Sequence, residues 1–441
     1  MMEKIDVLVI GGGPAGMAAA LGAQEAGAGS VLILERDHAL GGILQQCIHN
    51  GFGLHRFKTE LTGPEYARLD LERLHAAGIQ YRCDTMVLTI QHDHTVETIS
   101  PVDGCRTIQA NSIVLAMGCR ERPRGAIGIP GTRCSGIMTA GTAQRLVNLE
   151  GLMPGRRIVI LGSGDIGLIM ARRLTCEGAR VFACVELMPF SSGLKRNVVQ
   201  CLDDYQIPLF LSHTVVDIEG RERLEAVTIA RVDRDLKPVP GTEQRIACDT
   251  LLLSVGLIPE NELSRQIQVE LSPVTGGPVV DQHLQTSVDG IFSCGNVLHV
   301  HDLVDDVSAE SMEAGRQAAL YARNSLSGQK RTEAIRILDG SGARGVVPQL
   351  LRRPEADQAE SAVRISFQPA SVFQPAVISV SWQGKPLLVQ RRKILTPGEM
   401  CSFTLPAKAV AAVLSDGYGD LVVSAGHDRA GSGEGAVTHA G

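Results

Sequence analysis

The apolar residues of this chain fall mainly in short unbroken runs, not in a strict alternation with polar residues. Residues 5–10 read IDVLVI, residues 157–161 read RIVIL and residues 250–256 read TLLLSVG. Runs of roughly four to eight residues rich in β-branched side chains are typical of strands buried on both faces of a parallel sheet. Because helix-forming segments rich in small residues follow several of these runs, the pattern predicts an α/β fold.

The first apolar run leads directly into the sequence GGGPAG. Gly11 permits a tight turn, Gly13 lets the backbone approach a pyrophosphate, and Gly16 lets the following helix touch the strand. A second run at residues 31–34 ends in Glu35, which is placed to accept hydrogen bonds from the hydroxyls of an adenosine ribose. Strand, helix, strand and acid in this order predict a dinucleotide site whose helix N-terminus faces the phosphates.

The same arrangement occurs a second time, with GSGDIG directly after residues 157–161. Gly162, Gly164 and Gly167 repeat the three glycines, and Glu186 repeats the acid at the end of the next strand. Because a carboxylate would repel a ribose 2′-phosphate, Glu186 favours NAD over NADP. The alternative is a degenerate site that holds another adenine nucleotide or none.

Three further segments carry a family resemblance. Residues 112–118 (SIVLAMG) and 250–256 are apolar strands closed by glycine, and residues 289–302 read DGIFSCGNVLHVHD. Together with the two fingerprints they resemble the flavoproteins with two dinucleotide-binding domains, the superfamily of glutathione reductase and thioredoxin reductase. The resemblance implies FAD in the first site, NAD(H) in the second, and a contact between FSCGN and the ribityl chain. Asn296 departs from the acid usual there, although an amide can still bond a hydroxyl or phosphate oxygen.

The fingerprints and the resemblance together give the candidate cofactor-binding residues. They are Gly11, Gly13, Pro14, Ala15, Gly16, Glu35, Arg36, Gly42, Gly118, Gly162, Gly164, Asp165, Ile166, Gly167, Glu186, Gly256, Gly295 and Asn296.

The cysteine pattern argues against a disulfide reductase. The chain has 11 cysteines but no CxxC pair, and Cys47 has no near partner in the sequence. A dithiol that exchanges electrons with a flavin needs two neighbouring cysteines. No Cys/His group has the spacing of a zinc or iron–sulfur site, so no metal is expected.

A closer resemblance is to relatives without redox cysteines. GGILQQCIHNGFGLHRFK, ILGSGDIGLIMARRL and CGNVLHVHDLVDDVSAESMEAG look like segments of bacterial FAD/NAD-dependent oxidoreductases encoded with glycerol-3-phosphate dehydrogenases. They are similar, more distantly, to the FAD-binding subunits of hydrogen cyanide synthase, opine oxidase and sarcosine oxidase. The resemblance implies a protein that exchanges electrons with a partner flavoprotein dehydrogenase and a small redox subunit.

Three histidines are candidates for catalysis near the flavin ring. His49 follows the GGILQQ segment, and His299 and His301 follow CGN. Histidine can stabilise negative charge on a reduced flavin or shuttle a proton at neutral pH. The alternative is that they cap helices or hydrogen-bond inside the core. Three acids, Asp305, Asp306 and Glu310, are expected to form a first-turn cluster that favours the dipole of a helix starting near residue 304.

Composition narrows the function classes further. The 441 residues include 44% apolar residues and a formal charge of −6, so a basic nucleic-acid surface is not expected. The longest apolar runs fall short of the roughly 20 residues of a membrane span, and the first one enters the glycine loop, so no signal peptide is expected. Unspaced cysteines fit a reducing cytoplasm, with membrane attachment only through a partner.

The motifs predict two Rossmann-like domains, one inserted in the other, and a small β-rich C-terminal domain. The FAD-binding domain is split between residues 1–122 and 257–328, and the NAD-binding domain covers residues 123–256. Residues 329–361 are expected to be a linker and residues 426–441 a disordered tail. Residues 362–425 would form the β-rich domain, in which residues 377–392 read as a hairpin around Gln383-Gly384.

The expected function is hydride exchange between NAD(H) and FAD, with electrons passed to or from a partner that oxidises glycerol 3-phosphate or an amine or opine. The alternative is a nucleotide-binding scaffold subunit of a heteromeric dehydrogenase with catalysis on another chain. A flavin-dependent enzyme that modifies nucleic acid is disfavoured by the acidic charge balance and the complete second site.

Overall fold

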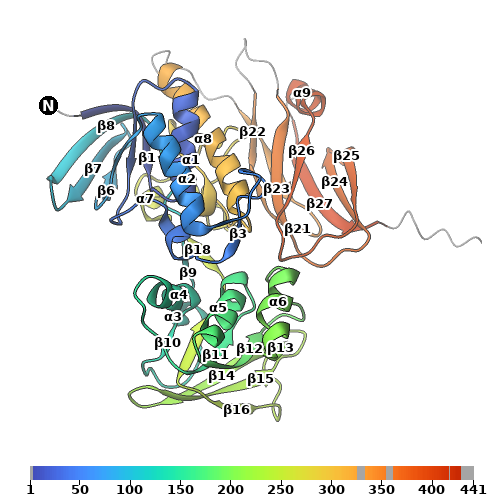
Figure 1. Ribbon diagram of the computed structural model, residues 1–441. Helices are drawn as coiled ribbons and strands as arrows, with labels where there is room; N and C mark the ends of the chain where they lie inside the picture. Colours follow the sequence, from blue (N-terminus) through green and yellow to red (C-terminus); the bar gives the residue numbers. More distant parts are fainter. Residues whose placement is uncertain (1–2, 325–332, 354–360, 417, 429–441) are drawn as a thin grey trace, which may run out of the picture.

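The computed structural model describes residues 3–324, 333–353, 361–416 and 418–428. Figure 1 shows three bodies: a first domain coloured blue and yellow, an inserted green domain below it, and an orange-red C-terminal domain beside the first. The first domain is built from the chain segments before and after the inserted domain, since β19, which follows the inserted domain in sequence, pairs with β8, which precedes it.

The first domain is built on a seven-stranded sheet of order β5-β2-β1-β8-β7-β6, with β19 on the second half of β8. Strands β5, β2, β1, β8 and β19 run parallel, whereas β6, β7 and the start of β8 form an antiparallel meander. Its elements are β1 (Glu3–Ile10), α1 (Pro14–Glu25), β2 (Val31–Leu34), η1 (Gly42–Gln46), β3 (Asn50–Phe52), β4 (Leu61–Thr62), α2 (Gly63–Ala76), β5 (Gln80–Arg82), β6 (Met86–Ile90), β7 (Thr95–Ser100), β8 (Gly104–Leu115), α7 (Glu262–Gln266), β19 (Ile291–Ser293), η3 (Gly295–Val297) and α8 (Val304–Asn324).

Helices α1 and α8 pack closely because each presents glycine to the backbone of the other. A Cβ built on Gly22 would lie 2.1 Å from the carbonyl oxygen of Met312, and one built on Gly315 would lie 1.8 Å from that of Ala19. This contact fixes the start of α8 beside the glycine loop of α1. Helix α1 begins at Pro14, within the fingerprint itself, because proline at the first helical position already has the φ that a helix needs.

The inserted domain repeats the Rossmann plan. Its five-stranded sheet has the order β10-β17-β11-β12-β13 and is parallel throughout, and a three-stranded antiparallel sheet β14-β15-β16 covers one side. Its elements are α3 (Arg124–Ile127), β10 (Ile137–Thr139), α4 (Ala140–Asn148), β11 (Arg157–Leu161), α5 (Asp165–Cys176), β12 (Arg180–Glu186), α6 (Lys195–Cys201), η2 (Asp203–Tyr205), β13 (Leu209–Leu211), β14 (His213–Gly220), β15 (Leu224–Arg231), β16 (Gln244–Ala247) and β17 (Thr250–Leu253).

Two short strands join the domains. β9 (Cys119–Glu121) and β18 (Leu257–Pro259) run antiparallel, with Leu257 opposite Glu121. Each follows one of the glycines that the sequence singles out, Gly118 and Gly256, and both glycines have positive φ. The two connections between the first domain and the inserted domain therefore pair with each other as a two-stranded ribbon (Figure 1).

The C-terminal domain is a sandwich of a five-stranded sheet, β22-β20-β27-β24-β25, and a three-stranded sheet, β21-β23-β26. Apolar side chains of both sheets form one core, which includes Phe367, Ile378 and Leu421. Its elements are β20 (Ala334–Asp339), β21 (Ala343–Val347), β22 (Leu350–Arg352), β23 (Val363–Pro369), β24 (Ala376–Trp382), β25 (Lys385–Arg392), β26 (Cys401–Leu405), α9 (Ala407–Asp416) and β27 (Leu421–His427).

One hairpin prediction is confirmed and two assignments in this region are wrong. β24 and β25 pair antiparallel around Gln383 and Gly384, both at positive φ as a two-residue hairpin requires. Residues 329–361 are not a linker, because 334–352 supply three strands whose apolar residues, Ile337 and Leu351 among them, enter the sandwich core. The tail prediction for 426–441 fails at its start, where β27 runs to His427; residues 429–441 lie outside the described part.

Candidate functional site

The first glycine loop forms an open cradle at the carboxyl end of β1. A Cβ built on Gly11 would lie 2.4 Å from the carbonyl oxygen of Ala116, so only glycine fits where the loop crosses β8. A Cβ built on Gly13 would meet no atom within 4 Å, which leaves room for a pyrophosphate over the N-terminus of α1. Gly42 closes the far side, since its Cβ position is 3.0 Å from the Cα of Gly13.

Glu35 lies at the end of β2 and is 7% exposed. Its two carboxylate oxygens accept hydrogen bonds from the backbone N–H of Gly12 at 2.6 Å and of Asp37 at 2.8 Å. These bonds fix the carboxylate beside the cradle and leave lone pairs for ribose hydroxyls. Arg36 is exposed next to it, and Pro14 and Ala15 begin α1. The residues present therefore fit the adenosine and pyrophosphate of FAD.

The second glycine loop has the same arrangement, but protein atoms fill more of the space around it. A Cβ on Gly162 would lie 2.0 Å from the carbonyl oxygen of Ser254, as Gly11 lies against Ala116, and one on Gly164 would lie 3.1 Å from Ser254 Oγ. The carboxylate of Glu186 accepts from the backbone N–H of Ser163 at 2.9 Å, from its hydroxyl at 2.6 Å and from the N–H of Met188 at 2.9 Å.

The loop of residues 187–194 lies over this second cradle. The N–H of Ser192 donates to Ser163 Oγ at 3.0 Å, and the N–H of Leu194 donates to Asp165 Oδ1 at 2.8 Å. The C-terminal domain supports the loop, because a Cβ built on Gly398 would lie 2.8 Å from the carbonyl oxygen of Ser192. The fingerprint residues thus fit a dinucleotide, although there is less free space around Gly164 than around Gly13 in the first cradle.

A cavity of about 260 Å³ lies between the two nucleotide-binding domains. Its walls include Cys47 and His49 from the segment before β3, Asp165 and Ile166 from the start of α5, and His301 from the segment before α8. Residues of both fingerprint domains therefore face one space, as hydride transfer between two cofactors requires.

The thiol at this cavity is not activated, and neither is the thiol of Cys119 on β9. Burial raises the pKa of the Cys47 thiol to about 12 and that of the Cys119 thiol to about 11. All the cysteines in the described residues are free. Because the thiolate is the reactive form, the raised pKa values make the thiols of Cys47 and Cys119 unreactive at neutral pH.

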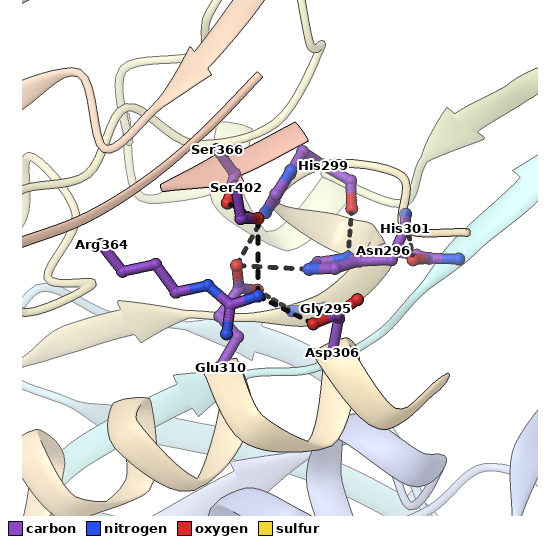
Figure 2. A network of polar contacts seen from close by, with 9 residues as sticks. All are labelled: Gly295, Asn296, His299, His301, Asp306, Glu310, Arg364, Ser366 and Ser402. Carbon is purple, nitrogen blue, oxygen red and sulfur yellow. Dashed lines mark hydrogen bonds and ion pairs between the residues drawn. The ribbon is translucent and has the colours of Figure 1, made fainter. Parts of the chain in front are cut away.

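Two of the candidate histidines meet a buried acid. His299 Nε2 lies 2.7 Å and His301 Nε2 lies 3.3 Å from the same oxygen, Oε2, of Glu310. The other oxygen, Oε1, accepts the backbone N–H of Gly295 at 2.8 Å. Figure 2 shows Glu310 rising from α8 toward the loop that carries both histidines, with Arg364 reaching in from the C-terminal domain. The sequence predicts a first-turn cluster of Asp305, Asp306 and Glu310. The two aspartates lie in the first turn of α8, but the prediction is wrong for Glu310, which lies beyond that turn and whose side chain meets His299 and His301.

The charge state of this group follows from its partners. Burial alone would raise the pKa of Glu310, but the two histidines hold it well below its usual value. Burial would lower the pKa of His301, yet the Glu310 carboxylate raises it above the usual value. Burial and the charge of His301 lower the pKa of His299. The group therefore carries one ion pair, between His301 and Glu310, with His299 neutral.

Asn296 connects this group to the crossing between domains. Its Oδ1 accepts the backbone N–H of His301 at 3.1 Å, and its Nδ2 lies 3.6 Å from Cys119 Sγ. A carboxylate could not donate to the thiol, which gives a physical reason for an amide here. Gly295 beside it packs on the first fingerprint, since its Cβ position is 2.7 Å from the Cβ of Ala15.

The third candidate histidine is separate from the pair. His49 is half-buried on the cavity wall, and its Nδ1 lies 3.0 Å from the carbonyl oxygen of Asn50. Burial lowers the pKa of His49, so it is neutral at pH 7.

Sequence reasoning misses three polar residues at this site. Finding Glu310 would have needed knowledge of which face of α8 is buried. Asp302 lies before α8 and contacts Met400, far away in the sequence. Gln144 comes from α4, 97 residues after Cys47, whose thiol it faces. Burial raises the pKa of Asp302 to about 6, while its Oδ2 accepts the N–H of Met400. Only the histidine-rich HVHD segment marks this region in the sequence.

Comparison with known proteins agrees with this geometry. A family model described as pyridine nucleotide-disulphide oxidoreductase matches residues 5–320. The chain is 26% identical to the HcnB subunit of hydrogen cyanide synthase from Pseudomonas protegens, with 60% of each chain covered. It is 27% identical to the A subunit of opine oxidase from Rhizobium meliloti, over 73% of this chain and 63% of the relative. The chain thus spans less than two thirds of these two relatives.

Thioredoxin reductases match over nearly their whole length. That of Mycolicibacterium smegmatis is 27% identical, over 74% of this chain and 97% of the relative. The crystal structure of the T. acidophilum enzyme superposes with a TM-score of 0.58 at 26% identity, over 74% of this chain and all of that one. No helix in the described residues is long and apolar enough to cross a membrane. The chain belongs to the pyridine nucleotide-disulphide oxidoreductase family.

Proposed function

We propose that this chain exchanges hydride between NAD(H) and FAD and passes the electrons to or from a partner redox protein. In this proposal residues 1–122 and 257–328 hold FAD and residues 123–256 hold NAD(H), each through its predicted cofactor-binding residues. The observation that carries it is the cavity of about 260 Å³ lined from both fingerprint domains. FAD, when bound, accepts two electrons and one proton as hydride from the nicotinamide C4.

The protein's own residues provide the position and the surroundings of this reaction. The glycine loops hold the two pyrophosphates, and the acids Glu35 and Glu186 orient the two riboses. Ile166 and Cys47 line the cavity, and the raised pKa of Cys47 keeps its thiol protonated at neutral pH. Hydride transfer requires the two reacting atoms at about 3 to 3.5 Å, a distance that the domains must hold.

The partner is proposed from the relatives. The HcnB protein of hydrogen cyanide synthase and the A chain of opine oxidase are named as subunits, as is the alpha chain of sarcosine oxidase, to which this protein is 29% identical over 314 residues. Without a cysteine pair, the electrons must leave or enter by another carrier. We therefore propose a cytoplasmic complex, attached to a membrane only through a partner, that oxidises glycerol 3-phosphate or an amine or opine.

The test is the absorbance of the purified protein under anaerobic conditions. We expect a yellow protein whose flavin band bleaches within seconds of adding NADH. Copurification with the products of adjacent genes, followed by substrate screening with an electron-accepting dye, tests the partner. A colourless protein that takes up no added FAD would contradict the proposal.

A second function is favoured by the loop over the second cradle. Ser192 and Leu194 donate hydrogen bonds to Ser163 and Asp165 of the fingerprint, where a nucleotide phosphate would compete with them. In this alternative the chain is a scaffold subunit whose cofactors stabilise a heteromeric dehydrogenase. Tightly bound flavin that NADH does not reduce would support it.

A further inference from the structure

The buried group of His299, His301 and Glu310 lies outside both glycine loops, and its member His301 lines the cavity between the two nucleotide-binding domains. We propose that Glu310 is a positioning residue that holds His301 as an imidazolium at the cavity wall, where its positive charge stabilises the negative charge that a bound flavin gains on reduction. This proposal rests on the proposed function, because it requires the flavin of the first cradle to face the cavity.

The two close neighbours of the His301 ring favour protons on both of its nitrogens. Its Nδ1 lies 3.0 Å from the carbonyl oxygen of His299, and its Nε2 lies 3.3 Å from Glu310 Oε2. A carbonyl oxygen can only accept, so Nδ1 carries a proton, and the carboxylate at ion-pair distance from Nε2 favours a proton there as well. The side chain of His301 is 2% exposed, so water screens this charge little.

The position of Glu310 is fixed from two sides. His299 donates to its Oε2 at 2.7 Å, a distance typical of a charge-assisted bond, and Gly295 donates to its Oε1. Gly295 packs against Ala15 of the first fingerprint, so the carboxylate is tied to the flavin cradle. Any shift of Glu310 would leave buried donors without a partner, which is costly.

The other charged groups around His301 leave its cation without a second close partner among the described residues. Asp306 is paired with Arg364 at 2.7 Å, and the carboxylate of Asp302 accepts the N–H of Met400. Asp165, which also lines the cavity, accepts from Leu194 and Asn197, and Arg196 and His49 line the cavity too. Glu310 therefore dominates the charge state of His301.

The same three side chains could also bind a metal ion, since their ligand atoms lie within 4.8 Å of one another. The short separation of 2.7 Å between His299 Nε2 and Glu310 Oε2 favours a shared proton. Two ligands about 2.0 to 2.1 Å from a tetrahedral zinc would lie further apart than this. Metal content is therefore a test of the proposal.

The experiment compares Glu310→Gln with Glu313→Gln in the FAD-loaded full-length protein. Glu313 is a matched control on the same helix, where it pairs with Arg316 at the surface. We expect Glu310→Gln to make reduction of the bound flavin at least tenfold less favourable at pH 7, which is about 30 mV for a two-electron couple. The control variant should keep the wild-type midpoint potential in the same spectroelectrochemical titration.

A second readout does not depend on flavin chemistry. Histidine ¹⁵N NMR of the unmodified protein should show one imidazolium that persists above pH 8 and is lost in Glu310→Gln. If Glu310→Gln does not fold, His301→Gln serves instead, because its amide can still donate to Glu310 while the cation is lost; the same fall in potential is expected.

Equal potentials for wild type and Glu310→Gln, a neutral His301 at pH 7, or one equivalent of metal in the purified protein would each overturn the proposal. Its failure is distinct from failure of the proposed function. If NADH does not reduce the flavin, chemical titration still gives the potential and NMR still gives the charge of His301.

Discussion

At the first cradle, a side chain built on Gly13 would meet no atom within 4 Å, whereas at the second the same construction on Gly164 would meet Ser254 Oγ at 3.1 Å. The carboxylate at the second cradle likewise has more partners within the protein than the carboxylate at the first. Glu35 accepts two backbone N–H groups, and Glu186 accepts two as well as the hydroxyl of Ser163. Two copies of one motif thus differ in how much of the site the chain itself fills.

This difference matches the roles proposed for the two cofactors. An open, pre-formed cradle suits FAD, which stays bound through many turnovers. A cradle with a loop hydrogen-bonded over it suits NAD(H), which must enter and leave, since the loop bonds compete with the nucleotide. We therefore expect tight flavin binding and weaker, exchangeable nicotinamide binding.

The largest expected effect comes from alanine at the third glycine of each loop. A Cβ on Gly16 would lie 1.7 Å from the carbonyl oxygen of Gly11, whereas one on Gly167 would lie 2.7 Å from the Cβ of Ser254. We expect Gly16→Ala to lower the free energy of unfolding by about 3 kcal/mol or more and Gly167→Ala by about 1 kcal/mol. Urea unfolding measures both, and equal losses would contradict the difference between the cradles.

The next effect separates the two acids. Glu35→Gln places an amide where both neighbours are N–H donors, so we expect a roughly tenfold or greater loss of FAD affinity. Glu186→Gln should leave the flavin content unchanged and raise the KM for NADH. Flavin absorbance after dialysis and steady-state kinetics with a dye acceptor give the two numbers. Loss of flavin from Glu186→Gln would mean that the assignment of cofactors to cradles is reversed.

A smaller effect concerns Asp302, at the cavity between the cradles. Burial raises the pKa of this carboxyl from 3.8 to about 6, so the folded state binds its proton more tightly than the unfolded state does. The contribution of Asp302 to the free energy of unfolding is therefore fully present below about pH 4. It is lost as the pH rises through 6, by at most about 1.4 kcal/mol per pH unit. Asp302→Asn should remove this slope in urea unfolding between pH 4 and 7; an unchanged slope would assign it to other groups.

The smallest effect makes the second cradle resemble the first. Ser163→Gly removes the hydroxyl that bonds Glu186 and Ser192, which should loosen the loop of residues 187–194 and change NADH affinity a few-fold. The reverse change, Gly12→Ser, places a Cβ 2.3 Å from Leu40 Cδ2, a side-chain end that can move aside, so we expect only a small loss of flavin. Isothermal titration with NADH tests the first variant and flavin content the second.

The repeated Rossmann plan could be predicted from sequence because it depends on local patterns. A buried parallel strand, a glycine turn and a terminal acid are contiguous, and β2, β11 and the hairpin of β24 and β25 lie where the sequence predicts them. The strands within residues 334–352 could not be predicted, since they are short and gain their burial from partners such as β27, more than 60 residues away.

The residues of the candidate site also fall into those that local sequence predicts and those that depend on tertiary packing. The glycines of both loops are visible in sequence because each is required by its own turn. Glu310 is not, since an acid in a helix is usually solvated, and only the packing of α1 on α8 turns it toward His299 and His301. The loop over the second cradle depends on Gly398 from a domain that the fingerprints do not predict.

Single-turnover reduction of the bound flavin by NADH, with and without deuterium at the transferred C4 position, tests the central claim most directly. If hydride crosses the cavity between the two cradles, the flavin band bleaches without any partner protein, and deuterium slows the bleaching. A flavin that stays oxidised with NADH but is reduced by dithionite would contradict the account and leave the chain a scaffold.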